Sequence, residues 1–172
     1  ETAALLGLHA VAITDRDGVY GVVLAHLAAQ EAHVHLIVGS QIGVKDDSHV
    51  VLLAQDRRGY ANLCRLVTKG RRRSPKGESS VTWWEVCEHA DGLIALWGGE
   101  GSLIVEEADP DDAARLLREA FSDRLYGLLT RHRRPEDHEQ ETRLRERATR
   151  YGIPLVAAIE VLYATPDRRP LQ

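Results

Sequence analysis

The feature that most constrains this chain is the regular alternation of short apolar runs with longer amphipathic stretches. The apolar runs do not alternate strictly between apolar and polar side chains, which is typical of strands that are buried on both faces in a parallel sheet. These runs lie at residues 9–14, 34–39, 50–54, 93–97, 125–129 and 155–159. The pattern therefore predicts several short strands that are separated by helices.

Four amphipathic stretches predict the helices, and they lie at residues 18–30, 56–70, 110–121 and 135–151. Asp17 is available to cap the first of them, and Gly70 suits the C-terminal end of the second. Strands that alternate with helices indicate right-handed βαβ units. The expected architecture is accordingly an α/β fold with a parallel sheet or barrel.

Composition narrows the class of protein. The chain has 172 residues, 44% of them apolar, and a formal net charge of −4, which suits one soluble globular domain. It contains no apolar run long enough to span a bilayer, and its two cysteines fit free cytosolic thiols better than a disulfide scaffold. Because the chain lacks methionine and opens within an expected helix, we interpret it as an internal piece of a longer cytoplasmic protein.

Two acidic residues follow the first expected strand at once. In parallel α/β folds, functional sites collect beyond the carboxyl ends of the strands, so Asp15 and Asp17 could hold a divalent cation there. The alternative, which the sequence favours, is that Asp15 caps a turn and Asp17 caps a helix. His33 and His35 share one face of a strand, but they begin it, which is the wrong end for such a site.

Three further residues lie near expected strand ends. His49 precedes a strand, His132 follows one, and Glu160 comes directly after the last apolar run. Each could be a metal ligand, although a lone histidine near a strand is more often a hydrogen-bonded surface or core residue. The glycines at 98–101 lack the spacing of a nucleotide fingerprint, and neither thiol has a partner at motif spacing, so nucleophilic catalysis has no support.

Basic clusters occur at residues 71–73, 131–134 and 168–169, and the first of them opens a segment, 71–80, that we expect to be an exposed loop. Such clusters could contact phosphates. Solvated charge is the commoner explanation, and aromatic residues do not interleave with the clusters as they do in single-strand stacking platforms.

Several segments taken together resemble the PHP (polymerase and histidinol phosphatase) domain of bacterial C-family DNA polymerases, the family of the polymerase III alpha subunit. The resemblance is closest to the error-prone branch, and it runs in the family's order through residues 12–23, 36–40, 51–64, 92–97, 154–158 and 168–172. It implies that residues 1–172 are one PHP domain of a longer polymerase. The implied fold is a distorted barrel of about seven strand–helix units with mostly parallel strands, whose N-terminal strand would precede Glu1.

The resemblance also assigns the positions that bind metal in active PHP domains. Asp15 and His49 match family ligands, while His132 and Glu160 are the other remnant positions that could still hold a metal. The remaining positions are degenerate. Arg16 stands in place of a histidine and Gln41 in place of a glutamate, while Gly99 and Leu162 replace a cysteine and a histidine. Glu160 itself stands where the family has an aspartate.

These replacements predict a structural PHP domain that has lost its metal cluster. The exchanges remove charge and lone pairs, and Arg16 adds a permanent cation that we expect to pair with Asp15 or Glu160. We therefore expect no cofactor in this domain and Mg²⁺ only in the parent polymerase. The expected partners are the other polymerase domains in cis and DNA through the parent, with no membrane contact.

Two other functions stay open. One is an active phosphoesterase or proofreading exonuclease that uses Zn²⁺ or Mn²⁺ at Asp15, His49, His132 and Glu160. The other is a stand-alone nucleic-acid-binding module that uses the basic clusters.

Overall fold

The computed structural model describes residues 2–132, 134–135, 137–159 and 161. One mixed sheet of six strands forms its centre, and the strands lie side by side in chain order. Their bounds are β1 Ala10–Ile13, β2 His35–Gly43, β3 His49–Ala54, β4 Leu93–Gly98, β5 Leu125–Leu129 and β6 Leu155–Ala157. Three of the five pairings are parallel, namely β1 with β2, β4 with β5, and β5 with β6. The predicted α/β class with mostly parallel strands is confirmed.

Strand β3 departs from the parallel pattern, because it runs antiparallel to both β2 and β4. The cause is a tight turn between β2 and β3. Within it the side chain of Asp46 accepts a hydrogen bond from the Ser48 amide, and Asp47 adopts a left-handed φ of 62°. A connection this short can join only antiparallel neighbours. The turn-forming residues at this point indicate the antiparallel direction of β3, which the apolar pattern alone does not indicate.

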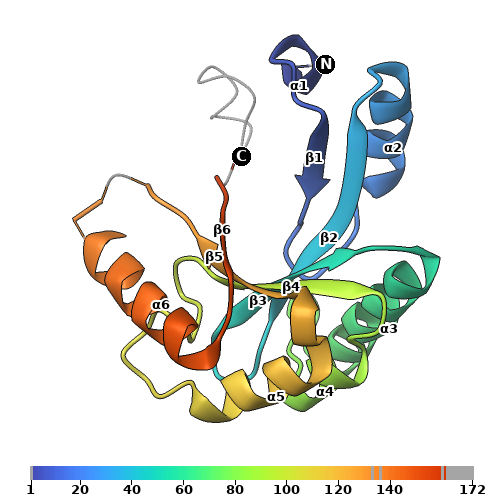
Figure 1. Ribbon diagram of the computed structural model, residues 1–172. Helices are drawn as coiled ribbons and strands as arrows, with labels where there is room; N and C mark the ends of the chain where they lie inside the picture. The colour runs from blue at the N-terminus through green and yellow to red at the C-terminus, as the bar shows by residue number, and fades with distance from the viewer. Residues whose placement is uncertain (1, 133, 136, 160, 162–172) are drawn as a thin grey trace.

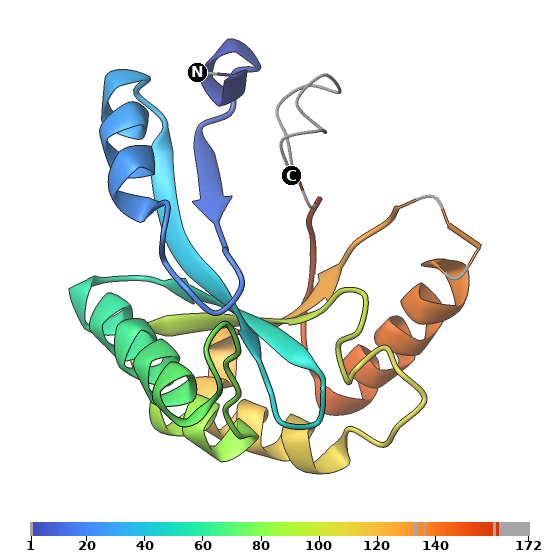
Figure 2. The same cartoon turned by 180° about the vertical axis from the view of Figure 1, so that it is seen from behind.

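The sheet is curled, and within the described residues β1 and β6 form its two edges without pairing to each other (Figures 1 and 2). Helices α3, α4, α5 and α6 cover the convex side of the curl, while α1 and α2 lie with β1 and β2 on a separate arm. The shape is thus part of a barrel, with one face of the sheet covered by helices and the opposite face partly exposed.

The helices are α1 Thr2–Leu5, α2 Val22–Glu31, α3 Arg57–Arg73, α4 Trp83–Glu88, α5 Asp111–Phe121 and α6 Asp137–Tyr151. The Asp56 carboxylate caps α3 by accepting a hydrogen bond from the Gly59 amide at 2.7 Å. Thr82 and Glu85 form a reciprocal capping box at the start of α4. Local capping chemistry therefore fixes where these two helices begin.

Two predicted helix boundaries are wrong. Helix α3 continues through Gly70 to Arg73, so the exposed loop begins at Ser74 and not at Arg71. Gly70 is buried within the helix, where a Cβ would lie 2.5 Å from the Ser79 hydroxyl, and so it serves close packing instead of termination. Helix α2 begins at Val22 with Gly21 as a cap that makes no side-chain hydrogen bond, so Asp17 does not cap it.

The core lies between the covered face of the sheet and helices α3 to α6. It is built from aliphatic and aromatic side chains that include Leu52, Leu63, Leu93, Trp97 and Phe121, all essentially inaccessible to solvent. Trp83 packs edge-on against Trp97, with ring centroids 5.9 Å apart. Trp84, the next residue in the chain, is 62% exposed.

The arm that carries α1, β1 and α2 is apolar but poorly buried. Helix α2 has no buried residue, and Val23, Leu24 and Leu27 are more than half exposed. Leu5 and Leu6 in and after α1 are likewise exposed. An isolated ten-residue helix is marginal in water, because helices of this length are stabilised mainly by packing of an apolar face.

Candidate functional site

The strand topology brings the positions predicted as ligands to one edge of the sheet. Strands β1, β2, β4 and β5 run in one direction and β3 runs in the other, so the carboxyl ends of the first four meet the amino end of β3. Asp15, Gln41, His49, Gly99 and His132 all lie at or near these ends. These positions therefore share one edge of the sheet. Glu160 and Leu162 lie outside the described residues.

Arg16 and Gln41 are direct neighbours in this arrangement. They form an isolated parallel bridge that continues the β1–β2 register three residues beyond its last pair, Ile13 with Val38. The same register continues across the sheet, because Gln41 pairs with Val51, Val51 with Leu96, and Leu96 with Tyr126. Residues paired in this way point to the same face. Arg16 and Gln41 therefore lie at one end of a row of paired residues, and the other members of that row have apolar or phenolic side chains.

The carboxylates of Asp15 and Asp17 accept hydrogen bonds from backbone amides, which is a structural role and not the metal-binding role considered from the sequence. The Asp15 carboxylate accepts a hydrogen bond from the Gly21 amide at 3.4 Å, so it faces the start of α2. Asp17 is 6% exposed, has a left-handed φ of 49°, and accepts a hydrogen bond from the Gly43 amide at 2.8 Å. The turn-capping alternative holds for Asp15, whereas Asp17 anchors the loop to β2.

The network around Asp17 extends to α3. Its carbonyl oxygen accepts a hydrogen bond from Arg71 Nε at 3.0 Å, and the Arg71 guanidinium also lies over the Tyr20 ring. Ser40 joins the same loop to β2, since its hydroxyl donates to the Asp15 carbonyl and accepts from the Gly18 amide. These contacts fix the loop after β1 as a structural element. Sequence reasoning missed Ser40, for which no signal was available.

Arg16 does not form the ion pair predicted with Asp15. Its Nε lies 3.9 Å from an Asp17 oxygen, and its side chain is 77% exposed. A contact this long to a largely solvated cation contributes little stability. The other predicted partner, Glu160, lies outside the described residues.

His49 lies against the backbone of the loop after β4. A Cβ built on Gly99 would be 3.9 Å from His49 Nε2, and one built on Gly101 would be 3.8 Å from Cε1. Gly99 and Gly101 have φ values of 83° and 77°, which favour glycine at both positions. The Ser102 hydroxyl also donates to the His49 carbonyl at 3.2 Å. The structure thus brings His49 and position 99 together, as the resemblance implies for two ligands, but position 99 has no side chain.

The loops after β4 and β5 are joined by an ion pair that sequence reasoning missed. Nη1 of Arg134 lies 2.7 and 2.6 Å from the two carboxylate oxygens of Glu100. In the second of these loops, the His132 amide donates to Asp137 at 2.7 Å. His132 is therefore part of a loop that is held to the start of α6. The signal in the sequence is that an acidic residue, Glu100, and a basic residue, Arg134, follow two successive strands of one sheet.

The other reactive side chains lie elsewhere. His33 precedes β2 with a φ of 54°, and His35 begins that strand, at the opposite end from Gln41. Burial, with a smaller contribution from Glu119, raises the pKa of the Cys87 thiol to about 11, so this thiol is protonated at neutral pH. Neither cysteine forms a disulfide. Nucleophilic thiol chemistry accordingly has no support at Cys87.

The donor set at the strand ends does not fit a cluster of divalent ions. Within the described part of the chain, no group of three or more histidine, cysteine, aspartate or glutamate side chains is arranged to hold a metal ion. Gln41 offers a neutral amide, Gly99 offers no donor, and Arg16 is permanently cationic. We therefore derive no catalytic step through a metal at this site.

Comparison with known proteins places these observations in a family. The PHP domain profile matches residues 1–132, and the chain belongs to the PHP domain family. The family membership that the sequence resemblance implied is thereby confirmed.

The individual relatives are polymerases. The chain is 40% identical over 170 residues to the error-prone DNA polymerase of Pseudomonas paraeruginosa and 34% identical over 174 residues to error-prone DNA polymerase 1 of Agrobacterium fabrum. These alignments cover 99% and 100% of the chain but only 16% and 15% of the relatives. The chain thus spans about one-sixth of the length of the curated relatives it matches.

A solved structure shares the fold. It was described as a putative metal-dependent phosphoesterase from Bifidobacterium adolescentis, and it aligns with a TM-score of 0.61 and 20% sequence identity. The alignment covers 91% of this chain and 78% of that one. At this identity the likeness supports the fold alone. No described helix has the length and apolar character needed to cross a bilayer.

Proposed function

We propose that this chain is a metal-free PHP domain that supports the structure of a cytoplasmic error-prone DNA polymerase during template-directed DNA synthesis in damage tolerance and repair. The polymerase reaction, with its Mg²⁺, takes place in other domains of the same polypeptide. The observation that carries the proposal is the pairing of Arg16 with Gln41 beside His49 and the side-chain-free Gly99. The parent polymerase is inferred from the similarity of the chain to four error-prone DNA polymerases.

Charge at the strand ends supports the metal-free state. A cluster of divalent ions requires several anionic or imidazole ligands to replace the water lost on binding. Here a guanidinium and an amide occupy two adjacent ladder positions, and the carboxylate of Asp17 is engaged by the Gly43 amide. His49 retains an imidazole, but one neutral ligand does not hold a multinuclear site.

The exposed apolar arm supports the structural role. Val23, Leu24 and Leu27 project from a helix that buries nothing within the described chain. At about 25 cal/mol per Å² of apolar surface, covering such side chains stabilises an assembly by several kcal/mol. The proposed occupant is the remainder of the same polymerase polypeptide, since the curated relatives are about six times as long as this chain.

The metal-free state is tested by elemental analysis of the full polypeptide after incubation with Zn²⁺ or Mn²⁺ and desalting, followed by an assay of phosphodiester hydrolysis. We expect no stoichiometric metal and no hydrolysis that depends on this domain. Two or three retained ions that disappear in a His49→Ala, Asp15→Ala variant, together with loss of hydrolysis, would establish the alternative, an active phosphoesterase or proofreading exonuclease.

The structural role is tested by primer extension and thermal unfolding of the full polypeptide. Leu24→Glu with Leu27→Glu places two charges on the apolar face of α2, and we expect a lower unfolding temperature and weaker primer extension. Gln30→Glu is the matched control, because it adds a charge to an exposed polar position of the same helix. Equal behaviour of the two variants contradicts a docking role for this face.

A further inference from the structure

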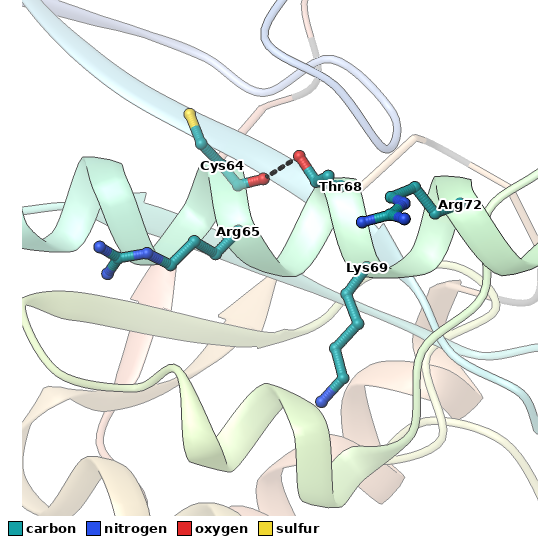
Figure 3. A pocket seen from close by; sticks show the side chains of 5 residues that line it. All are labelled: Cys64, Arg65, Thr68, Lys69 and Arg72. Carbon is teal, nitrogen blue, oxygen red and sulfur yellow. Dashed lines mark hydrogen bonds between the residues drawn. The ribbon is translucent and has the colours of Figure 1, made fainter.

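Helix α3 is strongly basic, although the chain as a whole carries a net negative charge. Its sequence, RRGYANLCRLVTKGRRR, contains seven basic residues and no acidic one, whereas the complete chain has a net charge of −4. Leu63, Leu66 and the buried glycines face the sheet, so the opposite side of the helix is presented to solvent. A shallow groove of about 350 Å³ lies on this outer side, lined by Cys64, Arg65, Thr68, Lys69 and Arg72 (Figure 3).

Apart from Arg71, which donates to the Asp17 carbonyl oxygen, the cations of α3 fall into two groups. Those on the side next to α4 are neutralised, because Lys69 pairs with Glu85 and Glu88, and Arg73 pairs with Glu85. In Figure 3 the Lys69 side chain extends away from Arg65 and Arg72. Arg58, near the first turn, pairs with Asp91. These cations have ordinary structural roles.

The second group consists of Arg57, Arg65 and Arg72, which we term the outer arginine row. No ion pair with a carboxylate is formed by these three in the part of the chain that the structure describes; Arg65 contacts only the Asn62 amide oxygen, at 3.0 Å. All three are exposed. Their spacing of eight and seven residues places them on one side of the helix, at axial intervals of about 12 and 10.5 Å.

The helix dipole explains only one member of the row, Arg72. Cations in the last turn of a helix interact favourably with its dipole, which accounts for residues 71–73, but cations in the first turn are disfavoured. Arg57 lies in the first turn and Arg65 at the middle of α3. The dipole therefore does not account for Arg57 and Arg65, whose exposed guanidinium groups are available to an external anion.

The charge of the row and a neighbouring aromatic ring indicate the class of partner. A row of exposed cations suits a polyanion that carries one charge per repeat, as the backbone of a nucleic acid does. Tyr60 is 39% exposed on the same helix, and its side-chain hydrogen bond with Cys64, which raises the pKa of Tyr60, holds it against the helix surface. An exposed ring beside arginines offers a stacking surface for a base.

We propose that the outer arginine row of α3 contacts the phosphodiester backbone of DNA, with Tyr60 as a stacking contact for a single-stranded segment. The inference goes beyond structural support and rests on the proposed assignment to a DNA polymerase. It identifies α3 as a secondary DNA-contact surface, separate from the degenerate strand-end site.

The test compares two variants of the full polypeptide with equal loss of charge. Arg57→Gln, Arg65→Gln, Arg72→Gln removes the row, and Arg115→Gln, Arg118→Gln, Arg145→Gln removes three exposed arginines from α5 and α6. Binding to fluorescein-labelled oligothymidylate and to a duplex is followed by anisotropy across a salt series. Because each neutralised phosphate contributes about 0.7 to the logarithmic salt slope for single strands, we expect the row variant to lower that slope by about 2.

Localisation is tested with a photocrosslinking residue at Thr68, on the row, or at Thr142, on α6. We expect crosslinks to labelled DNA from position 68 only. Tyr60→Leu should weaken binding to the single strand and leave duplex binding unchanged; equal weakening of both assigns the ring no stacking role.

An unchanged salt slope in the row variant, an equal change in the control variant, or crosslinking only to protein overturns the proposal. If the polypeptide does not extend primers at all, the failure lies with the proposed function and not with the row.

Discussion

The imidazole of His49 lies against Gly99, so that a Cβ at position 99 would approach Nε2 to 3.9 Å. A cysteine at this position would place a thiolate beside an existing imidazole, although the φ of 83° at Gly99 makes any side chain there strained by about 1–2 kcal/mol. The backbone conformation at Gly99 therefore resists the introduction of a ligand side chain at this position.

Restoration of ligands should restore metal binding. We expect Arg16→His, Gln41→Glu, Gly99→Cys to bind about one equivalent of Zn²⁺ or Co²⁺, because it removes a cation and adds three donors around His49. Elemental analysis and the thiolate-to-Co²⁺ absorption band give the readout. Arg16→His, Gln41→Glu, Gly99→Ala is the control, since it has the same strain without the thiolate. Equal metal content in the parent chain contradicts the prediction.

The carboxylate of Asp17 should stabilise the fold through its hydrogen bond with the Gly43 amide. We expect Asp17→Ala to lower the free energy of unfolding by about 1–3 kcal/mol, because it leaves a buried amide unpaired and places alanine at a left-handed φ. Asp17→Asn keeps an acceptor oxygen and tolerates this φ, so it should lose much less. Chemical denaturation measures both variants, and similar losses would contradict the assigned role.

Gly59 permits α3 to approach the sheet closely. A Cβ at this position would lie 1.9 Å from the Gly92 carbonyl oxygen, a contact that backbone cannot relieve without moving the helix. We expect Gly59→Ala to destabilise the fold by about 2–4 kcal/mol. Gly21→Ala is the control, because the nearest atom to its Cβ lies at 3.7 Å. Thermal unfolding that ranks the two variants equally would falsify this account of helix packing.

Glu85 should make stability depend on acid pH. Burial alone would raise the pKa of Glu85, but hydrogen bonds from Arg73, the Thr82 amide and Lys69 outweigh it and lower the pKa to about 2. A carboxyl group whose folded pKa is depressed contributes stability above its unfolded pKa and loses it as pH falls. We expect that contribution, about 2 kcal/mol, to fade between about pH 4.5 and pH 2.

The measurement is urea denaturation of the parent chain and of Glu85→Gln across that pH range. The variant should be less stable at pH 7, and the difference should narrow as the pH approaches 2. Glu139→Gln, which removes the exposed partner of Arg143, should change little at either pH. A constant difference between Glu85→Gln and the parent assigns the loss to packing instead of charge.

Apolar periodicity was sufficient to predict the six strands and, to within two residues, the starts of α3, α5 and α6. Asp56 and Thr82 act within three residues of their partners, so their effect is visible in the sequence. The direction of β3 depended on a turn, and the end of α3 depended on packing of Gly70 against Ser79, which is nine residues away. Tertiary contacts of this kind leave no periodic signal.

The candidate site, too, could be predicted only in part from the sequence. Gln41, His49 and Gly99, which the resemblance names as ligand positions, lie at one edge of the sheet. The resemblance did not predict the pairing of Arg16 with Asp17, nor the ion pair between Arg134 and Glu100. Both contacts depend on loop conformations, which the order of the strands does not determine.

The two open edges of the curled sheet have a consequence for how the chain behaves in isolation. Strands β1 and β6 each present backbone amides and carbonyls on the side that has no neighbouring strand within the described residues. Exposed edges of this kind recruit further strands. Separated from its surroundings, the chain should pair edge to edge with its own copies, and light scattering that rises with protein concentration should accompany its purification.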